Sequence, residues 1–240
     1  MRPVQVIAHR GASAYAPENT RAAFDLALAM GADALETDVR ASCDGALVLC
    51  HDATVDRVSN GHGLVAALTL SELQRLDFGA WFAPRFAGER LLTVEDFLAR
   101  YGRRCPFAIE IKAPGIEERL LSLVADAGLL SDVVFTSFSL DYLENMRRLE
   151  PEARLGYLTR RFDEATIDLL QQRGFAQICP AGAAVTPALV QRSQAVGLTV
   201  RAWGISDEGI QDRALRAGVD GMTVDWPDRL IGRLQVLGWR

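Results

Sequence analysis

The sequence predicts an α/β fold, a TIM (β/α)8 barrel with a small insertion between the second strand and the second helix. Short apolar runs alternate eight times with segments of helical periodicity, which is the order of a parallel barrel. The length of 240 residues suits one such domain, which we expect to span 1–240. Five helical segments end at a glycine, the residue that most readily closes a helix: Gly31, Gly128, Gly174, Gly197 and Gly218.

The elements follow from the periodicity of the apolar residues. Strands are expected at Val4–Ala8, Ala34–Arg40, Phe107–Ile111, Val133–Thr136, Arg154–Leu158, Gln177–Cys179, Thr199–Ala202 and Gly221–Val224. Helices are expected at Thr20–Met30, Val94–Tyr101, Glu117–Ala127, Leu140–Leu149, Glu164–Arg173, Pro187–Ala195, Glu208–Ala217 and Pro227–Leu237. An open, doubly wound sheet is the alternative, but eight consecutive strand–helix units fit closure into a barrel better.

The segment from about 41 to 105 is too long for one connection between a strand and its helix. Asp44-Gly45 is typical of a hairpin turn, and Ala46–Cys50 of a short strand that returns from it. A glycine-rich stretch at 59–63 and a short helix beginning at Ser71 follow. An aromatic group comes next: Phe78, Trp81, Phe82 and Phe86. Because long ordered loops usually serve function, we expect this insertion to lie over the mouth formed by the carboxyl ends of the strands.

Charge and composition exclude several classes of protein. The net charge of -5 and the pI near 5.3 argue against a surface for nucleic acid or anionic membranes. No segment has the ~20 apolar residues that cross a bilayer. The four cysteines include no C-x-x-C pair, which indicates free thiols in a reducing compartment. Since the N-terminus also lacks the pattern of a secretory signal, we expect a cytoplasmic protein. The sequence indicates no oligomeric state.

Three carboxylates stand at the ends of predicted strands. Glu36 and Asp38 lie late in the second strand, and Glu110 lies late in the third. Residues two apart on a strand point to the same side, so Glu36 and Asp38 would both face the barrel axis. Such acids repel one another unless a cation or several bases balance them. Because carboxylate oxygens suit a hard ion, the group predicts one divalent cation, Mg²⁺ or Ca²⁺. The alternative is a set of charges that pair with one another.

Basic side chains and histidines are predicted at the same mouth. His9 and Arg10 end the first strand, and Lys112 follows Glu110 by two residues. Arg10 and Lys112 can donate hydrogen bonds to phosphate oxygens. His9 and His51 can exchange protons near neutral pH, one as base and the other as acid. Together these residues indicate hydrolysis of a phosphoester. The alternative, in which both histidines bind metal, lacks the H-x-H pair of such hydrolases.

Three further residues carry weaker predictions. Trp203, at the end of the seventh strand, is expected to form an aromatic wall of the mouth, with a place at the edge of the core as the alternative. Asn19 is expected to cap the first helix and to brace Glu36 or His51. Asp225 is expected to bond a loop or to cap the last helix.

These motifs resemble the bacterial glycerophosphodiester phosphodiesterase family, nearly from end to end. Each motif alone is weak, but the ordered set at these spacings is specific. The motifs are His9-Arg10-Gly11, Ala16-Pro17-Glu18-Asn19-Thr20, Glu36-Thr37-Asp38-Val39, Asp44-Gly45, His51-Asp52, Glu110-Ile111-Lys112, Ser137-Phe138, Trp203, Gly218-Val219-Asp220-Gly221 and Asp225-Trp226-Pro227. The resemblance implies a TIM barrel that hydrolyses deacylated phospholipid head groups to sn-glycerol 3-phosphate and an alcohol.

The resemblance also implies roles for the residues at the mouth. Glu36, Asp38 and Glu110 would hold a Ca²⁺ or Mg²⁺ ion, and Arg10 and Lys112 would bind the phosphate. His9 would be the base and His51 the acid. The reaction would pass through a cyclic phosphate or through direct attack by water, and the sequence leaves both routes open.

Two other functions stay open. One is hydrolysis of lysophospholipids, for which Trp81, Phe82 and Phe86 would line an acyl channel. The other is binding of phosphorylated ligands without catalysis.

Overall fold

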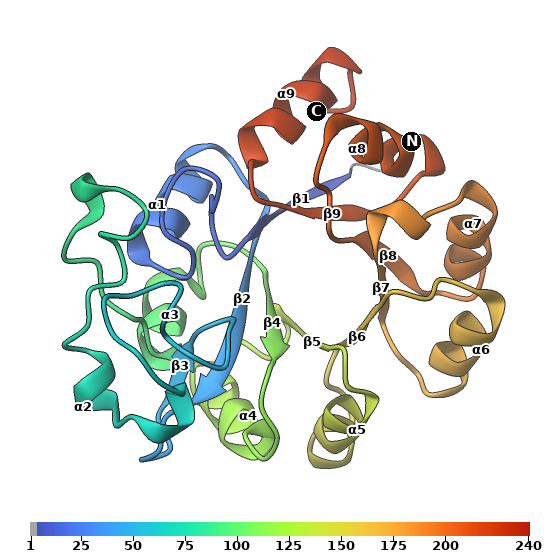
Figure 1. Cartoon of the computed structure of the whole chain (residues 1–240). Helices are drawn as coiled ribbons and strands as arrows, with labels where there is room; N and C mark the ends of the chain where they lie inside the picture. Colours follow the sequence, from blue (N-terminus) through green and yellow to red (C-terminus); the bar gives the residue numbers. More distant parts are fainter. Residues whose placement is uncertain (1–3) are drawn as a thin grey trace.

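A computed structural model describes residues 4–240 and confirms the predicted TIM barrel (Figure 1). Eight parallel strands form the barrel, and pairing of β1 with β2 closes it. These strands are β1 (Gln5–His9), β2 (Ala34–Ala41), β4 (Phe107–Ile111), β5 (Val133–Ser137), β6 (Leu155–Thr159), β7 (Gln177–Pro180), β8 (Thr199–Ala202) and β9 (Gly221–Val224). The short strand β3 (Leu47–Leu49) pairs antiparallel with β2, as expected for the return strand of a hairpin.

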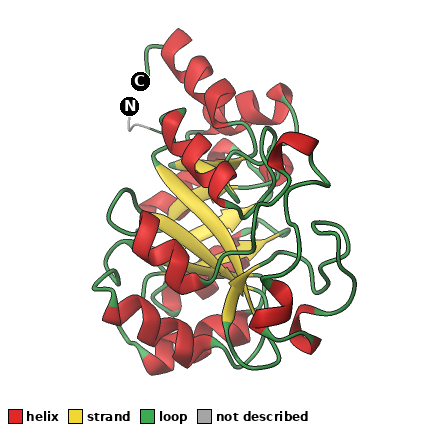
Figure 2. Ribbon diagram, turned by 90° about the vertical axis from the view of Figure 1, so that its left-hand side faces the viewer, coloured by secondary structure: helices red, strands yellow, loops and turns green. Residues whose placement is uncertain are grey.

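Helices surround the strands, as Figures 1 and 2 show from two directions. The outer helices are α1 (Arg21–Ala29), α3 (Val94–Tyr101), α4 (Glu117–Asp126), α5 (Leu140–Leu149), α6 (Glu164–Gln172), α7 (Pro187–Ala195), α8 (Glu208–Ala217) and α9 (Pro227–Val236). The insertion adds α2 (Leu70–Leu73) and short 3-10 turns at Val65–Ala67 and Pro84–Phe86, and lies beside α1 and α3 in Figure 1.

The main core fills the space between the barrel and its helices. Phe24 of α1, Phe97 and Tyr101 of α3 and Phe107 of β4 form one aromatic group, with Phe97 5.0 Å from Phe24 and 5.5 Å from Phe107 between ring centroids. Edge-to-face contacts of this kind add to the free energy gained by burying the rings. The packing fixes α1 and α3 against the strands that carry the site.

The insertion has a smaller apolar cluster of its own, made of Val48, Cys50, Val55, Val58, Val65, Leu73, Phe78 and Leu91. The other predicted aromatic residues, Trp81, Phe82 and Phe86, stack edge to face near the surface, and Trp81 is 40% exposed. Phe78 thus stabilises the insertion as part of its apolar cluster, while Trp81, Phe82 and Phe86 lie outside this cluster.

The turn after β1 depends on Gly11. Its φ of 86° lies in the left-handed region, and an added Cβ would stand 2.5 Å from the carbonyl carbon of Ala23 in α1. Both effects oppose any side chain at this position.

We therefore expect Gly11→Ala to lower the free energy of unfolding by about 2–4 kcal/mol, through backbone strain and steric overlap. Gly174→Ala is the control, because Gly174 also has a positive φ (64°) but an added Cβ would meet open space. That variant should lose only about 1–2 kcal/mol. Urea unfolding measures both, and equal losses would show that contact with α1 does not matter.

Candidate active site

The register of the strands brings the predicted site residues together. His9 lies opposite Glu36 across the β1–β2 pair, and Asp38 lies opposite Glu110 across the β2–β4 pair. Neighbouring strands are about 4.8 Å apart, so residues in register are immediate neighbours. Two adjacent pairings therefore gather one histidine and three acids at the carboxyl end of the barrel.

His51 reaches the same place from the loop that follows β3. The side chain of Arg40, in β2, donates from Nε and Nη2 to the carbonyl of His51 at 3.0 and 2.9 Å. The same guanidinium donates from Nη1 to the carbonyl of Lys112 at 3.2 Å. Arg40 thus ties the end of the insertion strand to the end of β4, which holds His51 beside the barrel mouth.

The loop after β1 contains two residues with a left-handed backbone conformation, Arg10 (φ 55°) and Asn19 (φ 58°). The Arg10 amide donates to the carbonyl of Glu36 at 2.9 Å and lies 3.2 Å from its Oε2. The Asn19 amide donates to the Arg10 carbonyl at 3.0 Å. Non-glycine residues in this region are strained, and such strain is common at functional sites.

The prediction for Asn19 was wrong in both parts. Thr20 is the N-cap of α1, because its side chain accepts a hydrogen bond from the Ala23 amide. Asn19 instead donates from Nδ2 to Asp38 Oδ2 at 3.3 Å and accepts from the Thr37 hydroxyl at 2.8 Å. Its left-handed backbone turns the side chain toward β2, where it orients Asp38.

The three acids form a compact set of cation ligands. One carboxylate oxygen from each of Glu36, Asp38 and Glu110 lies within 4.8 Å of the other two, and all three residues are buried. The buried Oδ1 of Asp38 accepts no hydrogen bond from the described residues, although Lys112 Nζ lies 3.5 Å away. An oxygen-only set with an unused buried oxygen fits a hard divalent cation.

The neighbouring bases pair with these acids. Arg10 Nε lies 2.9 Å from Asp38 Oδ2, and Lys112 Nζ lies 2.8 Å from Glu110 Oε1. The predicted alternative, in which strand-end charges pair with one another, therefore describes part of the arrangement. The same two side chains also line the cavity, where they can reach a bound anion.

Burial and charge separate the proton affinities of the acids. Burial and the charge of Asp38 raise the pKa of Glu110 to about 7, and the same two causes raise the pKa of Glu36. Burial also disfavours the ionised form of Asp38, but the positive charges of Arg10 and Lys112 outweigh it and lower the pKa of Asp38 to about 2. Like charges this close cannot all ionise freely, so two of the three acids retain protons more readily than usual.

Each of the two histidines has a carboxylate partner. Asp225 Oδ1 lies 2.5 Å from His9 Nδ1, and Asp52 Oδ1 lies 2.7 Å from His51 Nδ1. A carboxylate at Nδ1 orients the ring and leaves Nε2 to exchange protons. Ser13, in the loop after β1, also donates to Asp225 at 2.9 Å. Of the two alternatives predicted for Asp225, the structure confirms the bond to a loop, and α9 has no side-chain N-cap.

The partner of His51 belongs to a wider ion-pair network. Arg57, in the insertion, lies 2.6 Å from Asp52 and 2.7 Å from Glu18. Glu18 in turn lies 2.9 Å from Arg10. The ion pair of Arg57 with Glu18 therefore joins the insertion to the loop after β1, which carries Arg10.

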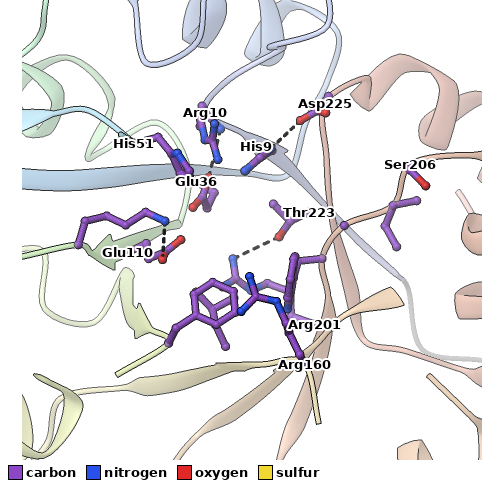
Figure 3. Close-up of a pocket in the computed structure, with 16 residues that line it drawn as sticks. His9, Arg10, Glu36, His51, Glu110, Arg160, Arg201, Ser206, Thr223 and Asp225 are labelled. Atoms are coloured by element: carbon purple, nitrogen blue, oxygen red, sulfur yellow. Dashed lines mark hydrogen bonds and ion pairs between the residues drawn. The ribbon is translucent and has the colours of Figure 1, made fainter. Parts of the chain in front are cut away.

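These side chains surround one cavity of about 460 Å³ at the mouth (Figure 3). Most of the predicted residues line it: His9, Arg10, Glu36, His51, Glu110, Lys112 and Trp203. Asp38 is fully buried and lies behind this surface. Trp203 is half-buried and stacks edge to face on Phe138, with 5.1 Å between ring centroids, so it forms an aromatic wall as predicted.

Several lining residues were not predicted from the sequence. Arg201 is only 4% exposed and donates from Nη1 to Thr223 Oγ1 at 3.3 Å. Arg201 lies on β8, two residues before Trp203, which follows the strand. This spacing was a usable signal that both side chains face the barrel interior. Arg160 also reaches the cavity, from the loop after β6, where no periodicity marks its direction.

No helix within residues 4–240 has the length and apolar character to cross a membrane.

Comparison with known proteins gives one consistent result. A profile of the glycerophosphoryl diester phosphodiesterase family matches residues 9–229. A glycerophosphodiester phosphodiesterase of Caldanaerobacter subterraneus is 36% identical over 94% of this chain and 96% of its own. The crystal structure of a glycerophosphodiester phosphodiesterase from Agrobacterium tumefaciens has a TM-score of 0.87 and 33% identity, and covers 95% of this chain and 99% of its own.

A second solved structure is an Oleispira antarctica phosphodiesterase in complex with the product sn-glycerol-3-phosphate. It has a TM-score of 0.86 and 29% identity, with 97% of each chain covered. The family match spans nearly the whole barrel, and the relative and both structures match almost end to end. This chain belongs to the glycerophosphoryl diester phosphodiesterase family and is a phosphodiesterase.

Proposed function

We propose that this enzyme releases sn-glycerol 3-phosphate from glycerophosphodiesters in a reaction that needs a divalent cation and two histidines. The observation that carries the proposal is the convergence of three buried carboxylates with His9 and His51 on one cavity. The product named in the Oleispira antarctica complex is the same compound. Phosphoester hydrolysis requires charge neutralisation and proton transfer at one place, and this cavity offers groups for both.

Glu36, Asp38 and Glu110 would hold the cation, Mg²⁺ or Ca²⁺. When bound, the cation would attract the phosphate oxygens and neutralise the charge that develops on them. Arg10 and Lys112 would donate to the same oxygens and orient the phosphate between the histidines.

His9 is the proposed base and His51 the proposed acid. Burial disfavours the protonated form of His9, but the hydrogen bond with Asp225 and the nearby carboxylates outweigh this effect and raise its pKa. For His51, burial lowers the pKa and outweighs the effect of Asp38. A higher pKa makes His9 the stronger base, and a lower pKa makes protonated His51 the stronger acid. The same shifts reduce the fraction of enzyme in which His9 is neutral and His51 is charged.

The lysophospholipid alternative needs an apolar channel at the cavity. Trp81, Phe82 and Phe86 stack on one another in the insertion and do not line the cavity. The non-catalytic alternative is disfavoured by the two histidine–carboxylate pairs, since binding alone does not need oriented proton-transfer groups.

The test is release of sn-glycerol 3-phosphate from glycerophosphocholine and glycerophosphoglycerol by the purified enzyme. We expect release with Mg²⁺ or Ca²⁺ and none after EDTA treatment. Release that persists in EDTA would contradict the cation, and no release from either substrate with either ion would contradict the proposed reaction.

The affinity for the cation should fall as the pH is lowered. Because the pKa of Glu110 is raised to about 7, this carboxyl holds a proton below that pH and must lose it to bind a cation. We expect Kd to rise about tenfold per pH unit below pH 7 and to level off above about pH 8. Calorimetry with Ca²⁺ between pH 5.5 and 8.5 measures this, and a flat Kd would contradict the raised pKa of Glu110.

Two other sequence-based predictions stay predictions. They are the cytoplasmic location and the limits of a single domain over 1–240.

A further inference from the structure

One wall of the cavity is built from Phe138, Arg160 and Trp203, which follow β5, β6 and β8, and we call it the Arg160 wall. The two rings meet edge to face at 88°. The guanidinium carbon of Arg160 lies 5.1 Å from the Phe138 centroid and 5.9 Å from the Trp203 centroid. Figure 3 places Arg160 across the cavity from His9 and Asp225, so this wall lies away from the base.

Arg160 differs from the other cations of the cavity in its partners. Arg10 and Lys112 pair with carboxylates, and Arg201 donates to Thr223. Arg160 makes no hydrogen bond or ion pair with any residue in 4–240, and its contacts are with the two rings. Its charged group is exposed and keeps all its hydrogen-bond donors for a ligand.

The chemistry of this wall favours an anion. A guanidinium with free donors binds carboxylate or phosphate through two parallel hydrogen bonds, and the rings behind it keep it in place. A quaternary ammonium is bound in proteins by open aromatic faces. Here Arg160 already lies over the two rings, and its positive charge would repel an ammonium ligand.

We propose that the Arg160 wall selects the alcohol part of the substrate, and that it favours alcohols with an anionic group over those with only an ammonium group. The inference rests on the proposed function, because it assigns the wall to the leaving alcohol. The glycerol part carries no charge, so a free guanidinium offers it little selectivity. The cavity of about 460 Å³ is in the size range that holds molecules larger than glycerol 3-phosphate.

Two substrates isolate the effect of one anionic group. Glycerophosphoserine differs from glycerophosphoethanolamine only by a carboxylate. We expect kcat/KM to be roughly ten- to a hundredfold higher for glycerophosphoserine, the range of a hydrogen-bonded charge pair. Arg160→Gln should bring the ratio of the two values close to one, and Arg160→Glu should reverse it.

Arg161→Gln is the matched control. Arg161 is the next residue, its side chain is 85% exposed, and it pairs with Asp163 at 3.0 Å outside the cavity lining. This variant should keep the wild-type ratio. Since Arg160 and Arg161 are both exposed, neither change should impair folding.

The outcomes separate this inference from the proposed function. A ratio near one in the wild type, or a ratio that Arg160→Gln leaves unchanged, would overturn the selectivity. An equal loss for both substrates in Arg160→Gln would also overturn it, because it would place the glycerol against this wall. Absence of glycerol 3-phosphate from every substrate would instead contradict the proposed function.

Discussion

His51→Ala should lose roughly 10²–10⁴-fold in kcat on a natural glycerophosphodiester, the usual contribution of a general acid. An alkoxide leaves poorly without a proton, and His51 is the proposed donor. A diester of glycerol 3-phosphate with p-nitrophenol needs no such proton, because p-nitrophenolate is a stable anion. The same variant should therefore hydrolyse this ester at nearly the wild-type rate. Steady-state kinetics on the two substrates measure the difference.

His9→Ala provides the comparison, because a missing base impairs both substrates alike. His62→Ala is the control for loss of an imidazole, since the side chain of His62 is 86% exposed and lies outside the cavity lining. If the p-nitrophenyl ester rescues the His9 variant and not the His51 variant, the two roles are exchanged. Near-normal turnover of the natural substrate by His51→Ala would remove this residue from the mechanism.

The fold was readable from the sequence because its units repeat. The strands Phe107–Ile111, Thr199–Ala202 and Gly221–Val224 begin and end where the apolar runs predict, and the others differ by one residue at one or both ends. Apolar runs between helical segments leave few other arrangements. All five glycines expected to end helices have positive φ.

The approximate position of the acids was also readable, because alternation along a strand and the order of parallel strands determine it. The partners of the histidines were harder to predict. Asp225 is 216 residues from His9 and reaches it because β9 pairs with β1, so its role depends on closure of the barrel. Arg57 lies in an irregular part of the insertion, where no periodicity indicates the direction of a side chain. The left-handed backbone of Asn19 likewise has no signal in a motif that resembles an ordinary helix start.

Glu110→Gln should weaken binding of the divalent cation by roughly a hundredfold or more, since it removes one of three charged ligands. The substitution keeps the shape of the side chain, and Lys112 keeps a partner in Asp38, 3.5 Å away, so the barrel should stay folded. Turnover should fall at a low concentration of Mg²⁺ or Ca²⁺ and recover partly at a high one. Glu118→Gln, on the exposed face of α4, is the control that should change neither quantity.

This variant also separates binding from structural support. In the wild type, the carboxyl of Glu110 titrates near pH 7 and should make the cation affinity depend on pH. Glutamine does not titrate, so the dependence below pH 7 should become weaker, leaving only the contribution of Glu36. A variant with unchanged Kd and unchanged pH dependence would show that Glu110 only pairs with Lys112. A lower affinity together with a weaker pH dependence would support Glu110 as a ligand.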